Sequence, residues 1–307
     1  MPYATLKQRL AGAIWPRDRL LSATSDDGLH WRRDPAALLH GDPWGTRMFY
    51  YPKALSTGSL LYPAGPASDG FAALQQDGGR WRPEDGWRFR LPAGTALKRI
   101  DGPEPCCWGP EDWRLFFAGH DGCDWRLYQA RAASPDRWEG VEACLDLKGQ
   151  GPLDQAKDPC LVHLGKKRLL CFTRFAPYGA SVLALASEGR SGWEVCAELP
   201  ELGKPGWGVR TPCAVALPGG GWRLYFSRYP LGTSRHSRLD VARSDDGTTW
   251  RIEREGVLEP GGPYDRHGLF CPSVVPEGEG WRLFYAGYWG RHLLEPLTLY
   301  QHRKRSP

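Results

Sequence analysis

TPCAVALPGGGWRLYFSR, residues 211–228, contains the motif that decides the fold. An Xaa-Pro pair opens a strand of alternating apolar residues, glycines turn the chain, and a second apolar strand returns. The pair recurs as Tyr51-Pro52, Glu104-Pro105, Asp158-Pro159, Thr211-Pro212 and Cys271-Pro272. The prolines are 53, 54, 53 and 60 residues apart, so the sequence predicts five repeats.

Each repeat continues with a third strand and a polar turn that leads to a tryptophan. Examples are RLDVARSDDGTTW (238–250), WRLYQARAASPDRW (125–138) and SVLALASEGRSGW (181–193). A repeat is therefore a four-stranded antiparallel meander of about 50 residues, the size of one propeller blade. We expect the recurring tryptophans to pack between blades; they are Trp31, Trp81, Trp138, Trp193 and Trp250. The SDDG turns resemble the Asp boxes of sialidase propellers, and we expect them to cap the hairpin between third and fourth strands.

The sequence thus predicts a single all-β domain over residues 1–307, a five-bladed β-propeller whose ring is closed by an N-terminal strand. The expected blades are residues 48–90, 104–145, 157–199, 210–255, and 269–303 together with 20–34. The last repeat ends after a third strand at 297–303, and SDDGLHWRR (25–33) supplies its fourth. Residues 20–24 then form one strand too many.

Composition excludes several classes of protein. The chain is 41% hydrophobic and 24% charged, which is typical of a globular domain. Its net charge of +5, from 40 basic and 35 acidic residues, is spread along the chain, and no run of 18 apolar residues occurs. We therefore expect no nucleic-acid partner and no membrane partner, and a small-molecule substrate instead. The oligomeric state does not follow from the sequence.

The nine cysteines form no regular pairing pattern, and several lie in apolar runs, which favours a reducing cytoplasm. Cys106, Cys160 and Cys213 follow the proline in three repeats, where they either ligate zinc or are small residues at a crowded axis. The second interpretation is simpler. We predict no metal and no cofactor.

At this point the chain resembles a family. Glu104-Pro105, Asp158-Pro159 and YDRHGLFCPSVV (264–275) followed by WRLFYAG resemble the five-bladed propeller glycoside hydrolases, namely arabinanases, β-xylosidases, invertases and levansucrases. The resemblance runs from about Leu20 to Arg303. It implies an enzyme that cleaves or transfers glycosyl units with carboxylates at the starts of the innermost strands. Asp158 matches the Asp-Pro motif that orients substrate or tunes the acid.

The candidate catalytic residues are Glu104, Asp158, Tyr51 and Asp265. Glu104 occupies an equivalent place to Asp158 in a neighbouring blade, but the family's blade-one aspartate, its base or nucleophile, falls near Tyr51. Tyr51 is then a nucleophile with a carboxylate partner, as in sialidases, or a hydrogen-bonded aromatic at a strand end. Asp42 and Asp101 lie where they can also reach the axis. Cys271 is either a thiolate nucleophile with His267 as base or a structural thiol.

The long loops between second and third strands place function on the face where the innermost strands begin. Basic residues gather there, and guanidinium groups suit an anionic ligand. The candidate substrate-binding residues are Lys157, Arg174, Arg210, Arg228, Trp44, Trp108, Trp207, His267, Cys271 and Trp289. The leading interpretation is a glycosidase-like enzyme for a small, anionic glycoside or sugar-like metabolite. The alternatives are a non-hydrolytic tailoring or cyclising enzyme that uses the same funnel, and a non-catalytic ligand-binding propeller.

Overall fold

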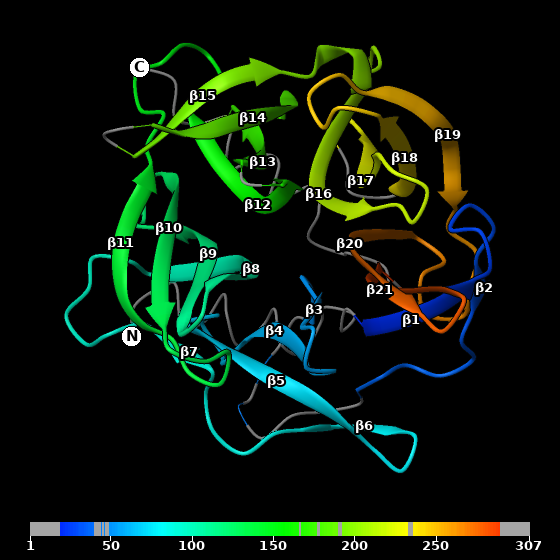
Figure 1. Cartoon of the computed structure of the whole chain (residues 1–307), viewed down its shortest axis with the longest axis horizontal. Helices are drawn as coiled ribbons and strands as arrows, with labels where there is room; N and C mark the ends of the chain where they lie inside the picture. Colours follow the sequence, from blue (N-terminus) through cyan, green and yellow to red (C-terminus); the bar gives the residue numbers. More distant parts are fainter. Residues whose placement is uncertain are drawn as a thin grey trace.

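The computed structural model describes residues 19–39, 44, 46, 49–165, 167–176, 179–189, 192–232 and 236–288. Those residues form five antiparallel sheets, four of four strands and one of five, set around a central axis (Figure 1). Each sheet is one blade, and the strand that carries or directly follows the Xaa-Pro pair is the innermost strand of its blade. The predicted all-β, five-bladed propeller is confirmed.

Four blades are each built from one continuous part of the chain. The first has β3 (Lys53–Ala54), β4 (Leu60–Ala64), β5 (Gly70–Asp77), β6 (Arg80–Pro83) and β7 (Phe89–Arg90). The second has β8 (Arg99–Gly109), β9 (Asp112–His120), β10 (Trp125–Ala132) and β11 (Glu139–Leu145). The third has β12 (Gln155–Leu164), β13 (Lys167–Phe175), β14 (Ser181–Gly189) and β15 (Gly192–Glu198), followed by the short 3-10 helix η1 (Pro200–Leu202). The fourth has β16 (Trp207–Ala216), β17 (Trp222–Pro230), β18 (Arg238–Ser244) and β19 (Arg251–Leu258).

The fifth blade joins strands from distant parts of the chain, in the order β2-β1-β21-β20. Its inner pair is β20 (Gly268–Glu277) and β21 (Gly280–Tyr288), and its outer pair is β1 (Arg19–Ser25) and β2 (Arg32–Arg33). Residues 20–24 are therefore the third strand of this blade, and the expectation that they are surplus is wrong. Residues 297–303 lie outside the described residues, and β1 takes the edge of β21 that we expected them to pair with.

Five apolar cores fill the gaps between neighbouring blades. Trp138, Trp193 and Trp250 are at most 7% exposed, and each packs in the core between its own blade and the preceding one. Trp31 and Trp81 pack in the same way against the cores on either side of the fifth blade. The recurring tryptophans are thus packing residues, as predicted.

The SDDG turns cap the hairpins between third and fourth strands, as expected. Asp246 Oδ1 accepts the backbone N–H groups of Thr248 and Thr249 at 2.7 Å each. These hydrogen bonds stabilise the carboxylate and lower its pKa. Gly247 and Gly28 have φ values of 74° and 73°, a conformation that favours glycine. The turns therefore have a structural role.

All nine cysteines are free thiols. In the described part of the chain, no helix is long and apolar enough to cross a membrane.

Deleting residues 1–34 should remove the two outer strands of the fifth blade and leave β21 with an open edge. An unpaired strand edge promotes association between molecules, and the core that contains Leu21 and Ala23 is lost. We expect the truncated protein to aggregate and to lose its cooperative melting transition, measured by calorimetry and light scattering. Cooperative melting at the wild-type temperature would contradict this role of β1 and β2.

Candidate active site

The five innermost strands lie around the axis (Figure 1). A residue–proline pair lies within four of them and directly before the fifth, β3. In four of them the pair forms a β-bulge, because the pairing register skips one residue at that point. The residue before each proline has a left-handed φ of 51–60°. We call these five pairs the Xaa-Pro ring: Tyr51-Pro52, Gly102-Pro103, Asp158-Pro159, Thr211-Pro212 and Cys271-Pro272.

The second blade contributes Gly102-Pro103 to this ring, so the prediction that Glu104-Pro105 is equivalent to Asp158-Pro159 is wrong. The sequence DGPEP contains two overlapping Xaa-Pro pairs, and only Gly102 has the left-handed φ, of 60°. A Cβ atom at Gly102 would lie 3.4 Å from Asp158 Cα, so glycine also lets two inner strands approach closely. Glu104 lies beyond the bulge, opposite Phe116.

Glu104 belongs to a second set of side chains, one level deeper along the axis. We call it the inner ring, and it consists of Lys53, Glu104, Cys160, Cys213 and Ser273. Cys160 and Cys213 occupy equivalent positions, as predicted, but Cys106 lies two residues further along its strand. Among the described residues, no group of three or more His, Cys, Asp or Glu side chains is arranged to hold a metal ion.

Most inner-ring side chains accept a backbone hydrogen bond from the next blade. Glu104 Oε1 accepts Leu161 N–H at 3.1 Å, and Cys160 Sγ accepts Ala214 N–H at 3.0 Å. Cys213 Sγ accepts Val274 N–H at 3.3 Å. In the fifth blade, Ser273 Oγ accepts the N–H of Ala54, in β3 of the first blade, at 3.0 Å. Four of the five junctions between blades are joined in this way.

The fifth junction differs because Lys53 has no acceptor atom in its side chain. The backbone nitrogen that would donate to it belongs to Pro105, which has no N–H group. Instead, the Lys53 ammonium forms an ion pair with Glu104 Oε2. Both oxygens of Glu104 are therefore engaged in holding neighbouring blades together.

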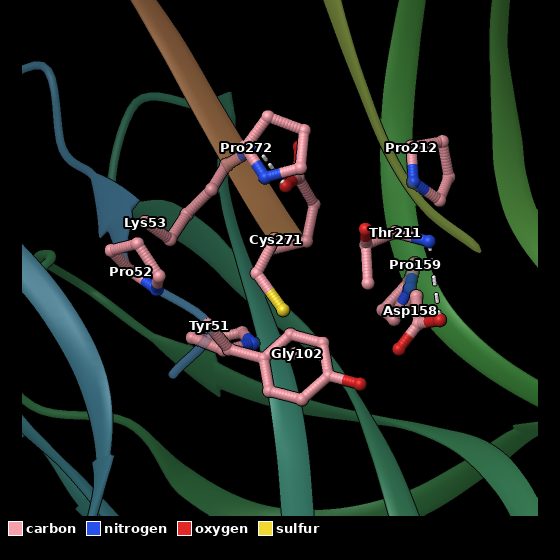
Figure 2. A pocket seen from close by; sticks show the side chains of 12 residues that line it. Tyr51, Pro52, Lys53, Gly102, Asp158, Pro159, Thr211, Pro212, Cys271 and Pro272 are labelled. Atoms are coloured by element: carbon pink, nitrogen blue, oxygen red, sulfur yellow. Dashed lines mark hydrogen bonds and ion pairs between the residues drawn. The ribbon is translucent and has the colours of Figure 1, made fainter. Parts of the chain in front are cut away.

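A narrow cavity of about 30 Å³ lies on the axis, lined by the Xaa-Pro ring together with Lys53 and Glu104 (Figure 2). This volume has room for roughly two water molecules. A sugar ring therefore cannot enter whole. At most one substituent of a ligand can reach down between the Xaa-Pro pairs.

Asp158 is the carboxylate in the wall of this cavity, and it is only 3% exposed. Its Oδ2 atom accepts hydrogen bonds from Thr173 Oγ1 at 2.8 Å and from Thr211 N–H at 3.3 Å. Its Oδ1 atom is buried without a hydrogen bond of good geometry from any described residue. Figure 2 shows the Tyr51 hydroxyl pointing toward Asp158. One oxygen is thus fixed, and the other faces Tyr51.

Burial raises the pKa of Tyr51 well above its usual value, and the negative charges of Asp158 and Asp101 act in the same direction. The phenol is therefore neutral at physiological pH and donates a hydrogen bond more readily than it attacks as a nucleophile. Burial likewise raises the pKa of Cys271, which argues for the structural thiol over the thiolate.

A group of charged and aromatic residues lies beside the cavity, and three of them, Asp101, Lys157 and Arg210, directly precede residues of its wall. We call this group the mouth, and it comprises Arg99, Asp101, Trp125, Lys157 and Arg210. Asp101 Oδ2 is 2.8 Å from Lys157 Nζ and 3.1 Å from Arg99 Nη2. Lys157 Nζ lies 4.1 Å from the centre of the Trp125 ring. Asp101 is fully buried and is not part of the cavity wall, so its suggested reach to the axis stays a prediction. Trp125 is a residue that we did not predict, although it ends the long loop GHDGCDW (119–125).

Several predicted site residues have other partners. Asp265 is fully buried and accepts hydrogen bonds from Arg33, Tyr285 and the backbone of Gly262, so it anchors the loop before β20. Arg174 binds Glu198 and the carbonyl oxygen of Leu153.

Arg228 is buried against Asp240 and donates to the carbonyl oxygen of Leu202. Asp265, Arg174 and Arg228 are not part of the cavity wall. Each forms ion pairs that cannot be recognised from its position in a repeat.

Trp44 and Trp108 are not part of the cavity wall either. Trp108 is near the end of β8, whereas the mouth is at the start of that strand, so its expected place on the mouth face is wrong. It packs between Arg114 and Arg168, whose guanidinium carbons are 3.9 and 4.1 Å from its ring centre. Trp44 packs against Trp87, with ring centres 4.7 Å apart.

Trp207 and His267 are not part of the cavity wall either. Trp207 stands at the start of β16, 5.3 Å below the guanidinium of Arg238. His267 is bound through its backbone to Tyr288 and His236, at the start of the fifth blade. Trp289 and Asp42 lie outside the described residues.

Replacing Lys53 with Met should destabilise the protein by about 3–5 kcal/mol, because the Glu104 carboxylate is left buried without its cation. The double variant Lys53→Met/Glu104→Gln should recover most of that loss, since glutamine keeps the acceptor for Leu161 N–H. Urea unfolding measures both effects. Additive losses in the double variant would show that the two side chains are not coupled.

Iodoacetamide at pH 8 should modify the exposed residues Cys107, Cys123 and Cys196 and leave Cys271 unmodified in the folded protein. The raised pKa of Cys271 keeps it as the unreactive thiol, and it is only 3% exposed. Peptide mass spectrometry checks the pattern, with urea-unfolded protein as the control. Rapid modification of Cys271 in the folded state would restore the nucleophile interpretation.

Comparisons with known proteins agree on architecture. No protein-family model and no curated protein sequence matches the chain. Solved structures do match. An α-L-arabinofuranosidase from Lactobacillus brevis superposes with a TM-score of 0.59 at 17% identity, covering 80% of this chain and 86% of that one.

Two further structures superpose over similar lengths. An endo-arabinase from Bacteroides thetaiotaomicron gives a TM-score of 0.56 at 14% identity, over 77% of this chain and 88% of the other. An N-acetylgalactosamine deacetylase from F. plautii gives 0.60 at 13% identity, over 87% and 85%. The chain therefore has the five-bladed propeller fold that carbohydrate-processing enzymes such as these use.

Proposed function

We propose that the protein is a carbohydrate-active enzyme of the glycosidase type, acting on a small anionic glycoside or sugar-like metabolite at the mouth of the axial cavity. The observation that carries the proposal is Asp158, a buried carboxylate in the cavity wall with one oxygen fixed by Thr173 and Thr211 and the other left without a hydrogen bond beside Tyr51. Asp101, which is fully buried against Lys157 and Arg99, is the second carboxylate of this region. Glycosyl transfer uses such a pair on either side of the bond that breaks.

The geometry suggests a distinct role for each group. Asp158 contacts the substituent that enters the cavity, and neutral Tyr51 donates a hydrogen bond to it. Asp101 fixes Lys157 and Arg99 at the mouth, where Trp125 offers a face on which a sugar ring can stack. We assign Glu104 to joining the blades, because Lys53 and Leu161 N–H already occupy its oxygens.

Two alternatives each rest on an observation. Tyr51 stands where the family resemblance places the base, which favours a binding propeller without catalysis. Tyr51 and Cys271 line the cavity beside the acids, which favours a tailoring or cyclising reaction without hydrolysis. Both alternatives keep the same ligand site, so measurements of binding and of turnover separate them from the leading proposal.

Asp158→Asn should lower turnover by at least about a hundredfold, the scale of a general acid or base contribution, while folding stays intact. The assay is a panel of nitrophenyl arabinosides, xylosides, glucosides, galactosides and glucuronides, with circular dichroism to verify the fold. Asp245→Asn, at an exposed turn, is the matched control.

Wild-type turnover by the Asp158 variant would reject the assignment. Binding of a glycoside without turnover by the wild type would favour the binding propeller. Conversion of a bound ligand without release of its aglycone would favour the tailoring enzyme.

A further inference from the structure

The basic residues around the cavity differ in whether a carboxylate neutralises them. Lys157 and Arg99 share Asp101, Arg174 pairs with Glu198, and Arg228 pairs with Asp240. No carboxylate oxygen of a described residue lies within 4.0 Å of an Arg210 nitrogen. Arg210 is the cation beside the Xaa-Pro ring that has no charged partner in the described chain.

The Arg210 guanidinium is held in place by aromatic residues. Its Nε atom donates to Tyr229 Oη at 3.0 Å, and its central carbon lies 4.8 Å from the Phe175 ring centre and 5.4 Å from that of Tyr229. The Tyr229 hydroxyl is itself 3.1 Å from Ser181 Oγ. Phe175 and Tyr229 are at the ends of β13 and β17, the second strands of the third and fourth blades, and Ser181 begins β14. A guanidinium fixed in this way presents its terminal N–H groups in a constant plane.

Arg210 also lies close to the cavity. It directly precedes Thr211, which is part of the cavity wall. The backbone N–H of Thr211 donates to Asp158 Oδ2 at 3.3 Å, so Arg210 is one residue away from a direct contact with Asp158. A ligand bound at this side of the cavity therefore lies near both Asp158 and Arg210.

The charges of the mouth and cavity leave room for one anion. Arg99, Lys157 and Arg210 oppose Asp101 and Asp158, so three positive charges face two negative charges, and the difference is +1. Deeper along the axis, Lys53 and Glu104 cancel each other.

His120, on the second-blade side of the mouth, adds no positive charge at neutral pH. Burial, together with the charges of Arg99 and Lys157, lowers the pKa of His120. A single negative charge therefore matches the site better than the two charges of a phosphate monoester.

We propose that Arg210 is the anion-recognition residue of this site and that the ligand carries one planar carboxylate, as a hexuronic acid or a related sugar acid does. The guanidinium of Arg210 takes the carboxylate in a two-point contact, and the sugar ring stacks over the aromatic side of the mouth. This inference rests on the proposed function and names its substrate class.

The experiment compares matched ligands by titration calorimetry: methyl glucuronoside with methyl glucoside, methyl galacturonoside with methyl galactoside, and glucose 6-phosphate. The wild type should bind one uronoside at least about tenfold more tightly than its neutral partner, the scale of a hydrogen bond to a charged group. Arg210→Met should remove that preference. Arg210→Lys should retain only part of it, because lysine cannot make the two-point contact. Arg251→Met, on an exposed outer strand, is the control and should leave the preference unchanged.

The outcomes separate the two proposals. Preferential binding of a uronoside, lost in Arg210→Met and without turnover of any glycoside, supports this inference and rejects the enzyme. Turnover of neutral glycosides with no preference for uronosides keeps the enzyme and overturns the inference. Tighter binding of glucose 6-phosphate, an unchanged preference in Arg210→Met, or no binding of any of the five ligands also overturns it. Calorimetric melting of each variant verifies that the fold is intact.

Discussion

The hydrogen bonds that run from one blade to the next around the axis are the constraint on which the site depends. Four innermost strands bulge at their Xaa-Pro pairs, and in four of the five blades a backbone N–H group just beyond the pair donates to the neighbouring blade. A buried N–H without a partner is costly, so the neighbouring blade must present an acceptor at that level. Glutamate, cysteine and serine meet the requirement at four junctions. The positions of the cavity-lining groups follow from this ring, because it fixes where every inner strand starts.

This constraint changes how Glu104 and Lys53 are understood. Lysine cannot accept a hydrogen bond, and the junction it would serve has a proline in place of the donor. The three residues Lys53, Glu104 and Pro105 therefore form a consistent set. A lysine at the first position requires a residue without an N–H at the third, and the ion pair with Glu104 replaces the missing link. A carboxylate on the axis of a propeller is thus not automatically a catalytic one, even in a fold that many glycosidases share.

The repeat pattern was sufficient to predict the architecture, because the Xaa-Pro pairs, the tryptophans and the SDDG turns each recur in the blades for a packing or turn reason. The site was only partly predictable. Asp158, Tyr51 and Cys271 line the cavity, since a residue before a conformationally restricted proline keeps its place in the repeat. The sequence predicts Glu104 in the Xaa-Pro ring, whereas it belongs to the inner ring. DGPEP contains two Xaa-Pro pairs, and only the backbone conformation selects between them. Trp108 was placed on the wrong face, because its position relative to the bulge sets which end of β8 it occupies.

Arginine roles were the least predictable part of the site, for an electrostatic reason. Arg174, Arg210 and Arg228 all occur near the mouth ends of their strands, and the sequence treats them alike. Their roles differ because two of them have carboxylate partners. Glu198, on the fourth strand of its blade, pairs with Arg174, and Asp240, on the third strand of its blade, pairs with Arg228. Arg210 meets aromatic rings instead, and aromatic contacts hold a guanidinium without neutralising it. The proposed anion site therefore depends on which arginine the surrounding blades leave without a carboxylate partner. That is a property of packing between blades, which no single repeat encodes.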